Sequence, residues 1–315
     1  MNPSRKSMLA LVSFAALALG AATPPMEDLV VKKGQTVSFI AFQKYGAYDD
    51  SIAKLIASDN PQIEDLDQVG VGQILHLRKD EKAPVAKELD PQRRILMASR
   101  RAVVTMMQGT GEIRRAVGGR EPLAANRFLV AGDSILTGAD GMAEIIVDNQ
   151  SVLRLAPGTE VRLSAIQEPQ HPAGVERRTL LTRFSLLHGK TWTKVQKWAG
   201  AVIAFQVQMP NAIAGVHGTV FENSIAQDSS SSVSVVQGEV GVQGVQDPAS
   251  VHRSLAPVQV AGPKEITAAQ WTKILKDGQR LGISKTGTPG SSEEFKPDPK
   301  SAWVRMNQER DSLCD

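Results

Sequence analysis

The chain has 315 residues, enough for two domains, and its 42% hydrophobic and 22% charged residues exclude disordered and collagen-like proteins. Its 36 basic and 33 acidic residues give a net charge of +3. A chain this close to neutral is a poor nucleic-acid binder, because such affinity rests on neutralising phosphates, and we expect no nucleic-acid partner. The single cysteine, Cys314, can form neither an intramolecular disulfide nor a thiolate metal site.

Residues 1–22 predict a secretory signal peptide. Arg5 and Lys6 precede an uncharged, mostly apolar run over 7–22 that ends in the small residues Gly20, Ala21 and Ala22. The apolar part is shorter than the roughly 20 residues that a membrane span needs. We therefore expect cleavage and export to the periplasm, and we keep an uncleaved membrane anchor as the alternative.

Residues 26–79 predict a small α+β module with the order strand, helix, helix, strand. A short strand over 29–31 is followed by a helix that Thr36 can cap. Asp49 and Asp50 can cap a second helix, and Asn60-Pro61 ends it. A strand over 74–77 closes the module.

The rest of the chain predicts a linker, an all-β domain and a C-terminal extension. Residues 80–101 are charged and contain proline, so we interpret them as a linker. Residues 102–245 alternate apolar and polar positions between turn signals, a pattern of many short strands in a sandwich, roll or solenoid-like domain. Residues 246–315 predict an extension with short strands over 270–276 and 280–284, a loop over 287–299 and a helix over 300–313. Within the β domain the predicted strands are 102–107, 143–148, 152–155, 159–163, 180–187, 191–195, 202–209, 219–225, 232–237 and 239–243.

Candidate catalytic and metal residues form no recognisable constellation. The sequence from Val216 to Thr219 is similar to the first histidine motif of L,D-transpeptidases, but the cysteine of their second motif is missing. The acidic residues Asp133, Asp140, Glu144 and Asp148 lack the dense spacing of a calcium loop, so we interpret them as caps of turns. We expect no catalytic site, metal or cofactor, and we predict that the protein is not an enzyme.

The module resembles a LysM domain over nearly all of 26–79. The resemblance is carried by residues 31–37, 40–41, 45–46, 55, 60–63 and 71–75. It implies binding of N-acetylglucosamine-containing glycans such as peptidoglycan, in a shallow groove between two loops. The first loop is Gly34, Gln35, Thr36 and Val37, and the second is Asp59, Asn60, Pro61, Gln62 and Ile63. Val37 and Ile63 would pack against the sugar. A LysM fold kept only as a spacer is the alternative.

The β domain resembles the FecR domain. The resemblance is carried by residues 130–144, 151–161, 187–190, 207–222 and 235–240, and residues 302–311 look like the C-terminal tail of that family. FecR itself is a membrane regulator that relays a periplasmic signal to a cytoplasmic anti-sigma segment. Six residues precede the apolar run in this chain, so we expect no such segment here.

The sequence thus predicts an α+β protein, with a small βααβ LysM module followed by an all-β FecR-type domain. Its predicted function is a non-enzymatic, periplasmic peptidoglycan-binding protein. The module would anchor it to the wall, and the β domain would engage an envelope protein of unknown identity. The alternative is a FecR-type membrane signal-transduction regulator with an uncleaved N-terminal anchor.

Overall fold

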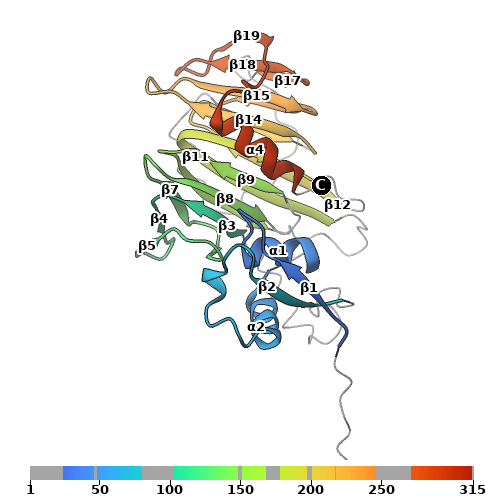
Figure 1. The fold of residues 1–315 in the computed structure, drawn as a ribbon. Helices are drawn as coiled ribbons and strands as arrows, with labels where there is room; N and C mark the ends of the chain where they lie inside the picture. The colour runs from blue at the N-terminus through green and yellow to red at the C-terminus, as the bar shows by residue number, and fades with distance from the viewer. Residues whose placement is uncertain are drawn as a thin grey trace, which may run out of the picture.

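The computed structural model describes residues 24–45, 48–79, 102–147, 151–167, 178–196, 201–216, 218–245 and 271–313. The predicted signal peptide (1–22), the predicted linker (80–101) and residues 246–270 of the predicted extension lie outside them. A small module with two helices lies at one end of the molecule, and a long stack of strands extends from it (Figure 1). Within the described ranges, every helix is too short or too polar to cross a membrane.

The module has the predicted order of strand, helix, helix and strand. Thr36 Oγ1 accepts a hydrogen bond from the Phe39 amide (3.2 Å), and Asp49 Oδ1 accepts one from the Ile52 amide (2.9 Å). These side chains satisfy amides that the first turn of a helix leaves unpaired, so each helix begins where the sequence predicted it. The elements are β1 (Met26–Val30), α1 (Val37–Tyr45), α2 (Asp50–Asp59), a 3₁₀ turn η1 (Leu66–Gln68) and β2 (Ile74–Arg78), with β1 antiparallel to β2.

The rest of the described chain forms two layers of strands, which we call the front and back sheets. In spatial order the front sheet contains β6 (Phe128–Leu129), β3 (Ala102–Gln108), β8 (Met142–Val147), β9 (Val152–Leu155), the end of β11 (Arg178–Lys194), β14 (Val220–Ile225), β15 (Ser231–Gln237), β18 (Gln279–Ile283) and β19 (Pro289–Glu294). The back sheet contains β5 (Arg120–Pro122), β4 (Gly111–Arg114), β7 (Ser134–Thr137), β10 (Glu160–Gln167), the start of β11, β12 (Ala201–Gln208), β13 (Ala212–Val216), β16 (Val240–Gly244) and β17 (Thr272–Leu275). Neighbouring strands are antiparallel except β11 and β12, which are parallel.

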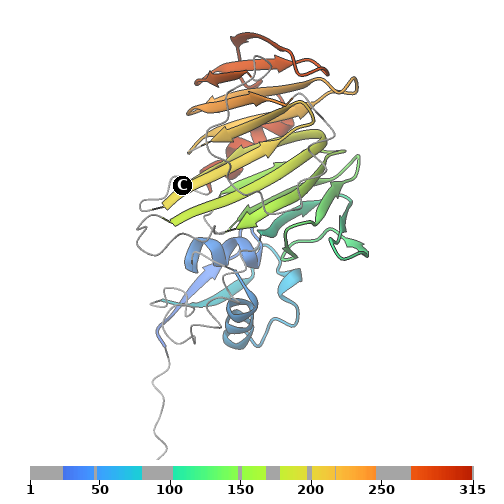
Figure 2. The same ribbon diagram turned by 180° about the vertical axis from the view of Figure 1, so that it is seen from behind.

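Alternate residues of each sheet meet in one apolar core. On β8, Ala143 and Ile145 point inward and join the same cluster as Val161 and Phe184 of the back sheet. The residues between them, such as Glu144, therefore point to the outer face of the front sheet. The helix α4 (Ala302–Ser312) lies on that face in Figure 1, and Figure 2 shows the molecule from behind.

The long strand β11 corrects the prediction of two separate strands at 180–187 and 191–195. The chain stays extended through Gly189, which has φ +90° and lies where β11 passes from the back sheet to the front sheet. A Cβ at Gly189 would lie 2.4 Å from Thr159 Oγ1, so only glycine fits this crossing. The glycine bends the strand without ending it, because β9 and β14 provide new pairing partners.

The C-terminal strands that the structure describes pair with strands of the two sheets. β17 pairs with β16 of the back sheet, and β18 pairs with β15 of the front sheet. β19 lies within 287–299, which was predicted as a loop, and pairs with β18. Its polar sequence has low strand propensity, so the pairing comes from the neighbouring strand rather than from local preference.

Candidate functional site

The outer face of the front sheet is divided into three stretches. α1 packs on one end, where Val103, Ile146 and Val152 share an apolar cluster with the module. α4 lies across the middle, over β8, β9, β11 and β14 (Figure 1). The other end, over β14, β15, β18 and β19, is an open groove. The first predicted glycan-binding loop lies at the junction of the first two stretches.

The first loop is bound by the β domain at several of its groups. Thr36 Oγ1 donates to the backbone carbonyl of Thr105 on β3 (2.7 Å). Arg310 Nη1 on α4 donates to the carbonyl of Gly34 (2.6 Å). The side chain of Val37 is fully buried, with 0% exposed. The loop is therefore part of the contact between the module and the β domain.

Three further hydrogen bonds define the shape and position of this loop. The Ser38 amide donates to Asn126 Oδ1 (3.0 Å), and Asn126 Nδ2 donates to Asp67 Oδ1 (2.7 Å). Gln35 Oε1 accepts from the Lys32 amide (2.9 Å), so it shapes the turn itself. Asn126 thus joins the start of α1 and the 3₁₀ turn η1 to one turn of the β domain.

The second predicted loop is organised by the buried Asn60. Its Nδ2 donates to the carbonyls of Ile56 and His76 (both 2.8 Å), and its Oδ1 accepts from the His76 amide (2.7 Å). Asp59 next to it makes a bidentate ion pair with Arg78, at 2.7 and 3.0 Å. These contacts make Asn60 and Asp59 supports of the loop, because their polar atoms are already paired within the module.

The exposed part of the second loop is Pro61 and Gln62, and Gln62 Nε2 donates one hydrogen bond to Asn60 Oδ1 (3.2 Å). Ile63 and Val37 are buried in the core of the module, at 9% and 0% exposed. The packing of these two side chains against a sugar stays a prediction, and in this arrangement both of them face the protein core. They face the same apolar cluster that holds α1 on the front sheet.

A buried ion network lies directly beside the first loop. Arg154 Nε and Arg310 Nε both donate to Glu144 Oε2 (2.7 Å), while Arg310 Nη2 (2.6 Å) and Thr105 Oγ1 (2.7 Å) donate to Oε1. Burial raises the pKa of Glu144, but the hydrogen bonds and charges of Arg310 and Arg154 outweigh burial and lower that pKa to about 2. The carboxylate is therefore ionised and fully hydrogen-bonded at neutral pH.

α4 adds a second set of polar contacts to the same face. The Asp311 carboxylate accepts from Arg154 Nη1 (2.6 Å) and Trp192 Nε1 (3.0 Å), and its backbone carbonyl accepts from Lys194 Nζ (2.9 Å). At the other end of α4, Trp303 Nε1 donates to Glu222 Oε2 (3.0 Å). These contacts bind the C-terminal helix along its whole length to strands β9, β11 and β14.

The acidic residues predicted as caps of turns have different outcomes. Asp133 accepts from two backbone amides of turns, and Asp140 accepts from the amide and hydroxyl of Thr110, so both are caps as predicted. Glu144 is instead the centre of the buried network, which is a correction; Asp148 lies outside the described residues. In the sequence, Glu144 is a charged residue between the apolar positions of β8. This pattern predicts that its side chain lies on the outer face of the sheet, but it does not predict that α4 covers that face.

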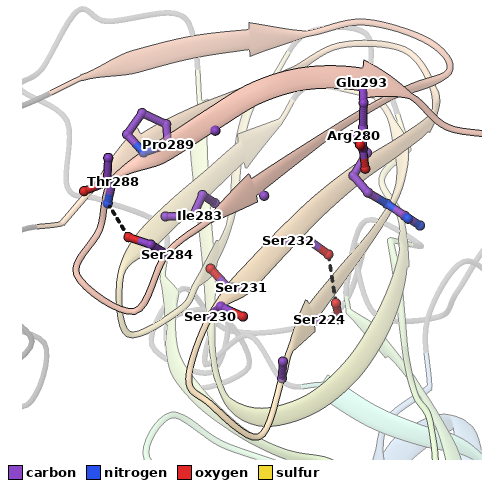
Figure 3. Close-up of a pocket in the computed structure, with 13 residues that line it drawn as sticks. Ser224, Ser230, Ser231, Ser232, Arg280, Ile283, Ser284, Thr288, Pro289 and Glu293 are labelled. Carbon is purple, nitrogen blue, oxygen red and sulfur yellow. Dashed lines mark hydrogen bonds between the residues drawn. The ribbon is translucent and has the colours of Figure 1, made fainter.

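The groove at the open end of the front sheet has a volume of about 610 Å³ (Figure 3). Serine hydroxyls line much of it, and Ser224 and Ser232 hydrogen-bond each other at 2.9 Å. Arg280 lies opposite Glu293 on the neighbouring strand, but it donates to Ser234 Oγ (2.8 Å) and stacks on Phe295 at 4.3 Å. The groove is shallow and hydroxyl-rich, and we assign it no ligand.

His217, in the stretch similar to the L,D-transpeptidase motif, and the single cysteine, Cys314, lie outside the described residues. Within the described ranges, no group of three or more histidine, cysteine, aspartate and glutamate side chains is placed to hold a metal ion.

Comparison with known proteins identifies part of the β domain. The family model described as FecR protein matches residues 133–241. Two crystal structures of a "putative anti-sigma factor" from Parabacteroides distasonis ATCC 8503 are similar, with 16% identity and TM-scores of 0.36 and 0.35. The similarity covers 54% of this chain and 63% and 64% of those chains. No curated protein matches the chain in sequence. Residues 133–241, which run from β7 to the start of β16, are a FecR family domain.

Proposed function

We propose that this protein is a non-enzymatic binding protein of the bacterial periplasm. In this proposal the 26–79 module binds an N-acetylglucosamine-containing glycan such as peptidoglycan, and the FecR domain presents a surface to an envelope protein. The resemblance of the module to LysM domains and its βααβ order support the first part. The FecR match at 133–241 supports the second part.

The observation that carries the glycan proposal is the second loop. Pro61 and Gln62 project into solvent from a loop whose backbone is fixed by the buried amide of Asn60. A side-chain amide such as that of Gln62 can donate to and accept from the acetamido group of N-acetylglucosamine. Because the loop is already ordered, binding would cost little conformational entropy.

The chemistry of the buried charges does not suit Glu144 to acid–base catalysis. A general acid or base needs a pKa near the working pH and a proton within reach of substrate. The pKa of Glu144 is about 2, and both of its oxygens are occupied by arginine and threonine donors. This carboxylate stabilises the docking of α4 and has no free proton to transfer.

The test is cosedimentation of the full exported chain with purified peptidoglycan. We expect binding, and we expect Gln62→Ala to lower the affinity by about three- to ten-fold, the equivalent of one hydrogen bond. Gln68→Ala is the matched control, because Gln68 is an exposed glutamine of the same module in η1. A chain that stays in the supernatant, or an equal effect of both substitutions, would contradict the proposal.

The second candidate function is a FecR-type membrane signal-transduction regulator, which the FecR match favours. It requires an uncleaved N-terminal anchor, and residues 1–22 lie outside the described residues. Cell fractionation and N-terminal sequencing of the mature protein separate the two functions. A membrane-bound chain that starts at Met1 would support the regulator.

A further inference from the structure

We propose that the FecR domain and α4 regulate the glycan site by occupying its first loop. Glycan and β domain would compete for residues 34–37, so the protein binds glycan weakly while the module is docked and tightly once it is released. This inference rests on the proposed glycan binding and adds how that binding is controlled. Three elements far apart in the sequence carry it: β3, the turn before β6, and α4.

The first step is that the β domain and α4 hydrogen-bond polar groups in and next to the first loop. The Gly34 carbonyl, the Thr36 hydroxyl and the Ser38 amide are bonded to Arg310, Thr105 and Asn126 respectively. Carbonyls, hydroxyls and amides of this kind are the groups that a loop offers to an acetamido sugar. A glycan in the first loop would therefore have to displace these partners or share the groups with them.

The second step is the geometry of Arg310. One guanidinium donates to Glu144 through Nε and Nη2 and to the Gly34 carbonyl through Nη1, and it stacks over Phe39 at 4.9 Å. The group is planar and rigid, so its position on Glu144 also sets its position on the loop. Gly34 has φ +81°, and a Cβ there would lie 3.1 Å from Arg310 Nη1. The loop is thus shaped for close contact with α4.

The third step is the burial of Val37. This side chain is 0% exposed and belongs to one apolar cluster with Val103 and Ile146 of the front sheet. In the docked protein this buried side chain offers no surface to a sugar. Pro61 and Gln62 of the second loop stay exposed, so the docked protein offers half of the predicted site.

The consequence is a two-state equilibrium with a measurable effect on affinity. If the complete site exists only in the released state, the apparent dissociation constant is the intrinsic constant divided by the released fraction. By linkage, any partner that stabilises the docked state lowers the affinity for glycan. Bound glycan lowers the affinity for that partner by the same factor. The junction would therefore couple wall binding to whatever the FecR domain binds.

Two substitutions release the loop by different routes. Arg310→Lys keeps a positive charge beside Glu144, but a single ammonium group cannot contact Glu144 and Gly34 as the planar guanidinium does. Asn126→Gly removes the amide that binds Ser38, and glycine tolerates the φ of +64° at this position. Arg305→Lys is the matched control, because Arg305 is an exposed arginine of the same helix.

The experiment measures calorimetric affinity of the full exported chain for a soluble N-acetylglucosamine oligomer, with hydrogen exchange of the Ser38 amide as a readout of release. We expect Arg310→Lys and Asn126→Gly each to speed Ser38 exchange and to tighten binding by about ten-fold or more, while Arg305→Lys changes neither. Faster exchange with unchanged or weaker binding would overturn the regulation and leave glycan binding intact. Absence of binding by the wild type and by both released variants would overturn the proposed function together with this inference.

Discussion

Two glutamate–arginine pairs lie on the outer face of the front sheet, one covered by α4 and the other in the open groove. Glu144 lies opposite Arg154 on neighbouring antiparallel strands, and Glu293 lies opposite Arg280 in the same way. Glu144 and Arg154 are covered by α4, are 0% exposed, and make an ion pair of 2.7 Å. Arg280 in the open groove turns instead to Ser234 and Phe295. Cross-strand position alone therefore does not decide whether two opposite charges pair.

This difference shows that opposite charges must form an ion pair once a helix buries them. In water the two groups are solvated, and an ion pair adds little to the free energy of folding. Under α4 the charges lose that solvation, and only pairing and hydrogen bonds offset the cost. The covered pair gains a second arginine, Arg310, and the hydroxyl of Thr105, so the network joins the helix, the sheet and the module in one unit.

The largest effect should come from Glu144→Gln. This substitution leaves Arg154 and Arg310 buried beside a neutral amide, and we expect a loss of about 3–5 kcal/mol in the free energy of unfolding. Denaturant unfolding followed by tryptophan fluorescence measures it, since Trp192 lies beside the network. A loss of unfolding free energy below about 1 kcal/mol would show that the buried pair contributes no more to stability than an exposed pair.

The pH dependence of stability should sharpen the same comparison. The folded pKa of Glu144 is about 2, below its ordinary value of 4.5, so its ionised form stabilises the fold above about pH 4.5. That contribution is lost as the pH falls through the window from about 4.5 to about 2, and it amounts to about 3 kcal/mol. The measurement is the difference in unfolding free energy between wild type and Glu144→Gln across that window. A difference that does not shrink toward low pH would contradict this assignment.

The smallest effect should come from the open pair. We expect Glu293→Gln and Arg280→Gln each to change the free energy of unfolding by less than about 1 kcal/mol. A double-mutant cycle should give a coupling energy below about 0.5 kcal/mol, whereas the same cycle on Glu144 and Arg154 should give several times that value. A coupling energy above about 1 kcal/mol between Arg280 and Glu293 would contradict the conclusion that only the covered pair is strongly coupled.

The strands differ in how far the sequence predicted them. β9 was predicted at its exact bounds, and β3 and β15 within one residue, because alternation of apolar and polar residues is a local signal of a half-buried strand. β5 and β6 have three and two residues, too few for any alternation, and they were not predicted. Their existence depends on neighbouring strands that supply the hydrogen bonds.

In the candidate site, too, local contacts could be predicted from the sequence and distant contacts could not. By itself, the sequence determined the two helices of the module, because Thr36 and Asp49 cap amides only two or three residues away. Only the tertiary structure decided the role of Glu144, whose arginine partners lie 10 and 166 residues away. It also decided that the first loop is in contact with the β domain, since Thr105 and Arg310, which bind Thr36 and Gly34, lie 69 and 276 residues away. Local hydrogen bonds are encoded in adjacent residues, but the solvation of a charge or a loop depends on what the whole chain places over it.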